Sequence, residues 1–166
     1  MKSFPKVGVI GSGQLAQMTL APAAALGIDL ITLANSSNDS AAQSSPHVVG
    51  DFRDLDTVRS FVTGCDVVTF EHELIPLSII RTLESEGVKF APSASAFQYS
   101  QDKALMREKL AHLPNPKWQI ITEAPEWNYP AIAKTISGGY DGRGVWTVNS
   151  KEELANLLKE VPKLLL

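Results

Sequence analysis

The sequence is poor in cysteine and has no long hydrophobic run. A single cysteine, Cys65, stands among 166 residues, which excludes a framework of internal disulfides. No stretch approaches the ~20 consecutive apolar residues that a membrane-spanning helix needs. Residues 1–20 also lack the basic start and the long apolar run of a signal peptide. We therefore expect a protein of the cytoplasm that has no membrane partner.

An excess of positive charge is absent as well. Fifteen Lys and Arg residues against 18 Asp and Glu residues give a formal net charge of −3, so no overall positive field favours nucleic acid. Hydrophobic residues make up 44% of the chain, which is enough for a sizeable core. These features predict a soluble globular protein, and any anion that it binds must be held by a local site.

The first ninety residues alternate between strand and helix patterns. Short β-branched or apolar runs predict strands at 6–10, 29–33, 47–50, 65–70 and 88–90, with helices beginning near residues 14, 55 and 76. Strands separated by helices pair in parallel through right-handed crossovers, and ligands bind at the carboxyl ends of such strands. Residues 1–92 are therefore predicted to form a parallel-sheet, Rossmann-like α/β domain.

Local signals refine the first two helices and the start of the third. Leu15, Met18 and Leu26 fall on one face of the first helix, and Pro22 is expected to kink or break that helix. Asp54 is the expected cap of the second helix. Pro76 is expected at the first position of the third.

The pattern changes after Pro92. Ser100 is expected to cap a helix over 101–111, and residues 93–116 read as a helical linker. Strands are predicted at 118–122, 130–136 and 145–148, and a Ser150–Glu153 capping box opens a last helix. Residues 117–166 bury too little to complete a domain. We expect an incomplete second subdomain, cut at the apolar run 163–166.

Four of the 11 glycines lie within seven residues between two of these strands, at Gly138, Gly139, Gly142 and Gly144. Glycine lets backbone N–H groups turn toward an anion, and Lys134 and Arg143 would add positive charge. The pattern favours a flexible flap over a triphosphate, with a long mobile hairpin as the alternative. A Walker A loop is excluded, because no Gly-Lys-Ser/Thr precedes a helix.

A second glycine pair, Gly11-Ser-Gly13, follows the first strand. It resembles the start of a dinucleotide fingerprint, but Ala16 holds the place of the third glycine. The second strand also ends without an acidic residue for the ribose of NAD, since Asp39 lies several residues into a loop. We therefore favour a phosphate or a substrate at the N-terminus of the first helix over NAD.

Two acidic residues, Glu71 and Glu73, follow the strand at 65–70. They share one face if the strand continues, and could then bind an amine or a ribose diol. A solvated acidic turn before the next helix is the alternative. A metal site is less convincing, because no second His or Asp is spaced to complete it.

Five sequence blocks together carry a resemblance to a known family. They are Gly-Ser-Gly-Gln-Leu-Ala-Gln-Met at 11–18, Thr-Phe-Glu-His-Glu at 69–73, Pro92-Ser93, Gln-Asp-Lys at 101–103, and Lys134 with Gly-Gly-Tyr-Asp-Gly-Arg-Gly at 138–144. This set resembles the 5-(carboxyamino)imidazole ribonucleotide synthases of bacterial purine biosynthesis, which are ATP-grasp ligases. The resemblance implies a pre-ATP-grasp domain followed by part of an ATP-grasp subdomain.

The resemblance also implies an activity and a set of contacts. The activity is ATP-dependent carboxylation of aminoimidazole ribonucleotide by bicarbonate, through carboxyphosphate, in IMP biosynthesis. The implied ATP contacts are Lys103, Lys134, Gly139, Tyr140, Asp141, Gly142, Arg143, Gly144 and Val145. The implied ribonucleotide contacts are Gln14, Leu15 and Glu73, with Glu71 as second choice. Mg²⁺ is implied too, with its ligands expected beyond residue 166.

The chain departs from the family in two respects. Gln17 stands where relatives usually carry an arginine, and relatives are more than twice as long. We therefore expect an N-terminal fragment that does not turn over alone. Two other hypotheses stay open: a non-catalytic module that binds nucleotide or pairs with a second chain, and an enzyme like the formate-dependent glycinamide ribonucleotide transformylase. A homodimer is also left open.

Overall fold

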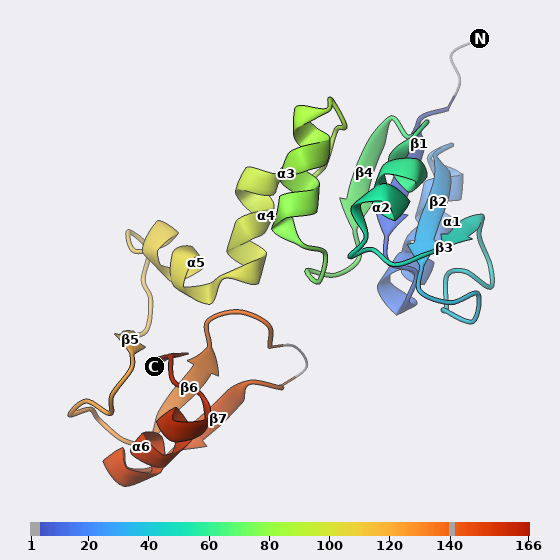
Figure 1. Ribbon diagram of the computed structural model, residues 1–166. Helices are drawn as coiled ribbons and strands as arrows, with labels where there is room; N and C mark the ends of the chain where they lie inside the picture. The colour runs from blue at the N-terminus through green and yellow to red at the C-terminus, as the bar shows by residue number, and fades with distance from the viewer. Residues whose placement is uncertain (1–3, 140–141) are drawn as a thin grey trace. The chain divides into compact units, whose positions relative to one another are not determined.

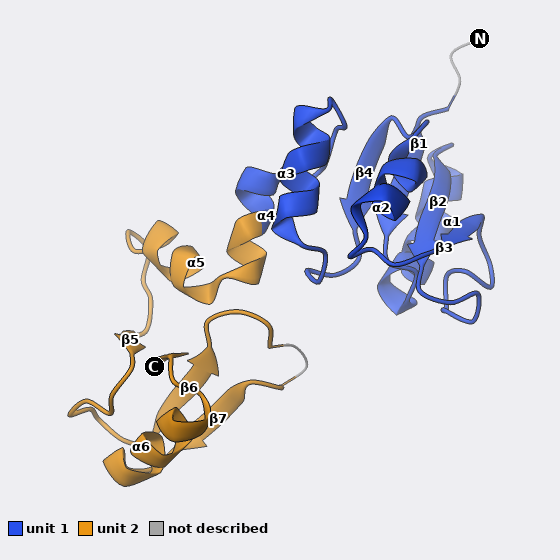
Figure 2. Ribbon diagram, viewed as in Figure 1, with its two compact units in different colours: residues 1–97 blue, residues 98–166 orange. Residues whose placement is uncertain are grey.

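The computed structural model describes residues 4–139 and 142–166. The chain divides into two compact units, residues 1–97 and 98–166, coloured separately in Figure 2. No helix among the described residues is both long and apolar enough to cross a membrane. Each unit has its own sheet and its own core.

Unit 1 is built on a four-stranded parallel sheet with the strand order β3-β2-β1-β4 (Figure 1). The strands and the three helices that follow them along the chain are β1 (Lys6–Ile10), α1 (Gln14–Ala25), β2 (Asp29–Ala34), β3 (His47–Val49), α2 (Leu55–Val62), β4 (Val67–Phe70) and α3 (Leu77–Ser85). In register, Ile10 of β1 lies between Leu33 of β2 and Phe70 of β4. The predicted parallel α/β fold is confirmed.

The two faces of this sheet are covered unequally. The main core includes fully buried Val58 of α2 and Ile80 and Leu83 of α3, and it continues through Phe97 of the next helix. A second, much smaller cluster contains Val9, Ala16 and Ala41. The hydrophobic effect thus anchors α2 and α3 far more strongly than α1.

The α1 helix differs from its prediction in two ways. It continues through Pro22 to Ala25, so the predicted break is wrong; Pro22 lies in the last turn, where it removes only one helical hydrogen bond. The side chains of Leu15, Met18 and Leu26 are 62%, 67% and 74% exposed, although their spacing suggested a buried face. The small Ala16 and Ala23 are the buried residues of α1 instead.

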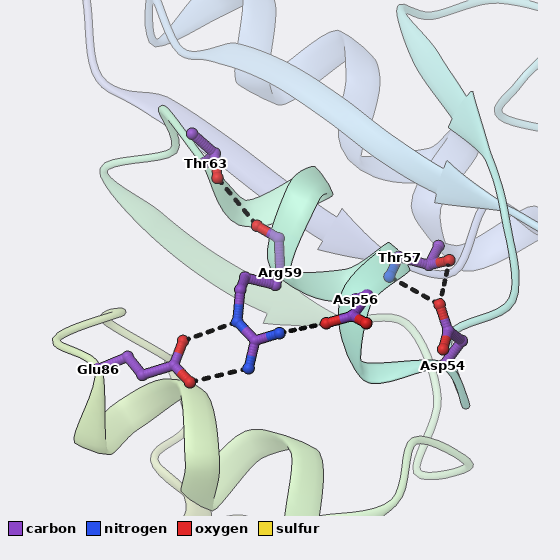
Figure 3. A network of polar contacts seen from close by, with 6 residues as sticks. All are labelled: Asp54, Asp56, Thr57, Arg59, Thr63 and Glu86. Atoms are coloured by element: carbon purple, nitrogen blue, oxygen red, sulfur yellow. Dashed lines mark hydrogen bonds and ion pairs between the residues drawn. The ribbon is translucent and has the colours of Figure 1, made fainter.

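Polar contacts fix both ends of α2, as Figure 3 shows. The predicted cap is confirmed, since the Asp54 carboxylate accepts hydrogen bonds from the Thr57 N–H at 2.8 Å and the Thr57 hydroxyl at 2.6 Å. Arg59 donates from Nε and Nη2 to the two oxygens of Glu86 at 3.0 and 2.9 Å, and also pairs with Asp56. These contacts link α2 to the C-terminal end of α3.

Three smaller expectations for unit 1 need correction. Pro76 is the N-cap of α3 and the helix begins one residue later, at Leu77. Residues 88–90 form no strand, because only Phe90 pairs with the sheet, in an isolated parallel bridge to Val68. β4 is shorter than the run at 65–70 suggested and ends at Phe70, so Glu71–Glu73 lies in a bend beyond the strand.

Unit 2 contains a second four-stranded sheet, with the order β5-β8-β6-β7 and antiparallel pairing throughout. Its elements, with the helix that crosses the boundary between the units, are α4 (Ala94–Gln101), α5 (Lys103–Lys109), β5 (Ile120–Ile121), β6 (Ala131–Thr135), β7 (Val145–Val148), α6 (Lys151–Glu160) and β8 (Leu164–Leu165). Leu154 and Leu158 of α6 pack with Ala133, Val148 and Leu164 in its core.

The helix predicted over 101–111 is α5, which begins at Lys103, and a separate helix, α4, precedes it. Asp102 separates them, because its carboxylate accepts from the N–H groups of Ala104 and Leu105 at 2.8 and 2.9 Å and so caps α5. The cap expected at Ser100 is therefore wrong. The Ser150 cap is confirmed, since its hydroxyl accepts from the Glu153 N–H at 3.2 Å.

Candidate functional site

The turn between β1 and α1 is closed by a carboxylate from the bend that follows β4. Gly13 is the N-cap of α1 and offers no side-chain cap. The Glu71 carboxylate takes that role, accepting from the N–H groups of Gly13 at 2.5 Å, Leu15 at 3.0 Å and Ala16 at 3.3 Å. The helix N-terminus where a phosphate was expected therefore already holds an anion of the chain itself.

Neighbouring bonds fix both sides of this turn. The Gly11 N–H donates to the Leu33 carbonyl at 3.0 Å, and the Glu71 N–H donates to the Ile10 carbonyl at 2.9 Å. The buried hydroxyls of Ser12 and Thr32 lie 2.8 Å apart, within hydrogen-bond distance. Strands β1, β2 and β4 thus hold the turn and its carboxylate in one arrangement.

The predicted ribonucleotide contacts gather around the same turn. Gln14 and Leu15 are exposed in the first turn of α1, and Leu15 carries one of the bonded amides. Glu73 is half-buried in the bend after β4 and has its own polar partner. The prediction that Glu71 and Glu73 share one face required the strand to continue through them, but β4 ends at Phe70. His72 packs 4.8 Å from the Phe52 ring.

A groove of about 450 Å³ runs beside this turn, between α1 and the sheet. Its walls are mainly apolar and include Val7, Val9, Ala23, Leu26 and Phe70. Among the described residues, Glu71 is the one ionisable residue of the lining. A groove that carries a carboxylate and no cation does not fit a phosphate. The chemistry for an anionic ligand must come from other residues.

In unit 2, a basic cavity of about 250 Å³ lies beside β6 and β8. Lys134 of β6 lines it together with Arg107 and Lys117, and Trp118, Trp127 and Leu165 add apolar wall. The Arg107 guanidinium is held in place, since it donates to Asn115 Oδ1 at 2.8 Å. Cations beside aromatic surface are suited to bind a nucleotide, through its phosphates and its base.

Sequence reasoning found Lys134 but missed Arg107 and Lys117. Lys134 was visible because it precedes the glycine-rich segment on an apolar strand. The other two cations stand on a short helix and in a linker, where a surface role is the ordinary expectation. The only signal nearby was the Pro114-Asn-Pro116 segment, whose Asn115 fixes Arg107.

The glycine-rich segment extends from the end of β6, next to Lys134. The Thr135 N–H donates to the Gly144 carbonyl at 2.9 Å and closes the hairpin. A Cβ at Gly139 would lie 2.5 Å from the Arg143 carbonyl oxygen, so a side chain is excluded there. Gly138 and Gly142 have positive φ angles and open space around them. Tyr140 and Asp141 lie outside the described residues.

Two other features complete this part of unit 2. The buried hydroxyl oxygen of Thr135 has no hydrogen-bond partner among the described atoms, and it faces Gly139 and Gly144. Lys103 begins α5, and its N–H donates to the Ile136 carbonyl at 2.9 Å. The predicted ATP contacts Lys103, Lys134, Gly139 and Gly144 therefore lie around the same end of β6.

A metal centre is not formed by the described part of the chain. No group of three or more His, Cys, Asp or Glu side chains gathers there in an arrangement that could hold a metal ion. Burial raises the pKa of the Cys65 thiol, which also makes a 3.7 Å contact to the Phe61 carbonyl oxygen. Cys65 is partly buried and packs against the main core of unit 1.

Comparisons with known proteins agree with this architecture. Residues 4–101 match the family of the ribonucleotide synthetase pre-ATP-grasp domain. The N5-carboxyaminoimidazole ribonucleotide synthase of Mycobacterium tuberculosis is 41% identical over 151 residues, which is 85% of this chain and 35% of that protein. The chain thus spans about a third of the length of this relative.

Solved structures agree as well. A carboxyaminoimidazole ribonucleotide synthase from Aspergillus clavatus, complexed with ATP, matches with a TM-score of 0.85 and 31% identity over 99% of this chain and 47% of that one. An N5-carboxyaminoimidazole synthase from the same organism, in complex with ADP and 5-aminoimidazole ribonucleotide, matches with a TM-score of 0.77, 28% identity and coverages of 99% and 46%. The resemblance to these synthases is confirmed, and the chain belongs to the family of the ribonucleotide synthetase pre-ATP-grasp domain.

Proposed function

We propose that this chain supplies the ribonucleotide-binding domain and part of the ATP site of a 5-(carboxyamino)imidazole ribonucleotide synthase. The observation that carries the proposal is the basic cavity in unit 2, where Lys134, Lys117 and Arg107 stand beside two tryptophans. The similar structures that hold ATP, or ADP with the ribonucleotide, support the same assignment. The reaction is ATP-dependent carboxylation of aminoimidazole ribonucleotide with bicarbonate.

The nucleotide is assigned to unit 2 because of charge and space. Lys134 lies in register between Val145 of β7 and Leu165 of β8, at the wall of the cavity. Its ammonium binds phosphate oxygens as a point charge. The glycine-rich segment that follows β6 adds backbone N–H groups, and Arg143, Lys103 and Val145 complete the proposed ATP contacts.

The ribonucleotide is assigned to the turn at the carboxyl ends of β1 and β4. Ligands of open parallel sheets bind at this edge. Gln14 and Leu15 are exposed there, and the Glu73 carboxylate offers an acceptor for a sugar hydroxyl or an amine. Glu71 is not assigned a direct contact, because its carboxylate already accepts three backbone N–H groups.

The reaction itself needs two transfers. A bicarbonate oxygen attacks the γ-phosphorus of ATP, the bond to the β,γ-bridging oxygen breaks, and carboxyphosphate and ADP form. The exocyclic amine then attacks the carboxyl carbon, phosphate leaves, and one amine proton is released. Cations and backbone amides favour the first transfer because they stabilise charge as it moves to the leaving oxygen. Mg²⁺ would neutralise phosphate charge further, and its ligands remain expected beyond residue 166.

The test is a chimaera in which this chain replaces the matched part of the Mycobacterium tuberculosis synthase. We expect phosphate release that requires both aminoimidazole ribonucleotide and bicarbonate, and incorporation of labelled bicarbonate into the ribonucleotide. In the same chimaera, Lys134→Met should abolish turnover, whereas Lys163→Met, at an exposed lysine of unit 2, should not. A folded chimaera that binds ATP but consumes it without the ribonucleotide would contradict the proposal.

A further inference from the structure

The two glycines of the Gly11-Ser-Gly13 turn make room for a side chain of the protein. A Cβ at Gly11 would lie 2.7 Å from the Cβ and 2.8 Å from Oε2 of Glu71. A Cβ at Gly13 would lie 2.6 Å from Oε1 of the same residue. In a dinucleotide fingerprint the corresponding space admits the pyrophosphate. Here the Glu71 carboxylate occupies it.

The backbone conformations of Gly11 and Gly13 differ, so the two positions require glycine for different reasons. Gly11 has a φ of 107°, which itself favours glycine. Gly13 has a φ of −85° and a ψ of −153°, so its backbone is extended and lacks the positive φ that favours glycine at Gly11. The approach of the carboxylate is therefore the contact that a side chain at Gly13 would disturb.

We propose that Glu71 is a positioning residue that serves as a built-in anion in the place of a ligand phosphate. It neutralises the N-terminus of α1, orients Gln14 and Leu15, and excludes an external phosphate from this turn. The part of the proposal in which Glu71 takes the place of a phosphate does not depend on the proposed function. The part in which Glu71 positions residues for ribonucleotide binding rests on it.

The electrostatics of α1 support this role. Its first turn contains no acidic residue, its N-cap has no side-chain bond, and its four first N–H groups carry the positive end of the helix dipole. Hydrogen bonds from N–H groups to a carboxylate are roughly twice as strong as neutral ones. Glu71 is also well placed to persist, because its own N–H is bound to the Ile10 carbonyl. An incoming phosphate would have to displace it and would meet its negative charge.

The inference is tested on this chain by following the ¹H–¹⁵N signals of Gly13, Leu15 and Ala16 during a titration with inorganic phosphate. Wild type should show no saturable shift at these amides. Glu71→Ala should expose them, so that phosphate now produces a saturable shift at all three. Glu73→Ala is the matched control, since it removes a neighbouring carboxylate and should behave as wild type.

Saturable shifts in wild type at the same phosphate concentrations would overturn the proposal, because the turn would then be open to external anions. No response in a folded Glu71→Ala would overturn it as well. If Glu71→Ala does not fold, Glu71→Gln keeps the size of the side chain. In that variant the Gly13 amide proton should move upfield, since a neutral acceptor replaces the carboxylate; an unchanged signal would contradict the assignment.

The positioning role is tested in the chimaera. Glu71→Gln should raise KM for the ribonucleotide at least about tenfold, which corresponds to about 1.4 kcal/mol, while KM for ATP stays within about twofold of wild type. A Glu71→Gln chimaera with unchanged KM for the ribonucleotide would refute positioning but leave the amide result intact. A wild-type chimaera without activity would instead count against the proposed function alone.

Discussion

The substitution Gly13→Ala isolates the contact between the β1–α1 turn and Glu71. The new Cβ would lie 2.6 Å from Oε1 and 3.2 Å from Cδ of Glu71. Contacts under 3.0 Å essentially never occur at real Cβ atoms, so the carboxylate must move away. The φ of −85° at Gly13 is negative, so the substitution does not place alanine in the left-handed region that favours glycine. The cost of the substitution therefore measures the loss of the carboxylate contacts.

The magnitude follows from the bonds at risk. Three N–H groups donate to this carboxylate, of which the Ala16 group is on a buried residue and the Leu15 group on an exposed one. A hydrogen bond to a charged group contributes about 1.5–3 kcal/mol, and water replaces part of that at exposed groups. We expect Gly13→Ala to lower the free energy of unfolding of unit 1 by about 3 kcal/mol, including up to about 1 kcal/mol for a poorer N-cap residue.

The assay must report on unit 1 alone. All three tryptophans, Trp118, Trp127 and Trp146, belong to unit 2, so their fluorescence is an internal control that should not change. Urea unfolding of unit 1 is instead followed by the amide signals of β1 and β2. The matched substitution is Gly87→Ala, at a φ of 96° with no atom within 4 Å of the new Cβ, which should cost about 1 kcal/mol of backbone strain.

A double-mutant cycle with Glu71→Ala decides the interpretation. Both single variants lose the same bonds, so the costs should not add, and the coupling between them should be about 2 kcal/mol. In the Glu71→Ala background, Gly13→Ala should cost less than about 1 kcal/mol, the part due to the cap. Additive costs, or a Gly13→Ala variant as stable as wild type, would refute the reasoning.

Three further substitutions test other parts of the chain. Lys134→Met should weaken ATP binding about 10- to 100-fold, because one charge-assisted contact to the phosphates is lost. Lys163→Met should leave the affinity unchanged, and calorimetry measures both. Leu154→Ala, at a fully buried residue, should cost unit 2 about 2–5 kcal/mol by tryptophan fluorescence, and Leu157→Ala less. Hydrogen bonds from Thr57 lower the pKa of Asp54. The stabilisation of unit 1 by the Asp54 carboxylate is therefore present above about pH 4 and is lost as pH falls through the lowered pKa. In Asp54→Asn, the free energy of unfolding should decrease less on acidification than in wild type.

The parallel sheet of unit 1 could be predicted because its strands and helices carry clear periodic patterns. The exposure of Leu15, Met18 and Leu26 could not, since helical spacing marks a face but not whether another element covers it. Asp102 was missed as a cap because Ser100 is an equally good capping residue two positions earlier. The strand expected at 88–90 is absent for a related reason: Val88 and Phe90 have strand propensity, but only Phe90 pairs with the sheet.

For the site, sequence could find the glycine-rich turns but not what fills them. At Gly13 the space beside the backbone is taken by Glu71, fifty-eight residues along the chain, and no local pattern indicates that contact. At Gly138 and Gly142 a Cβ would meet no atom within 4 Å, and Lys134 stands on the strand that leads there. Both turns resemble phosphate loops, because glycine frees backbone amides in both.

Occupancy and charge distinguish the two turns. A phosphate at the first would have to replace a carboxylate that three amides hold, in a part of the chain where the adjoining groove offers no cation. At the second, a Cβ at Gly138 or Gly142 would meet no atom within 4 Å, and Lys134 on the preceding strand lines a cavity together with Lys117 and Arg107. On the proposed function, Coulomb attraction therefore favours the triphosphate in unit 2, and we expect the turn at Gly13 to hold Gln14 and Leu15 in place.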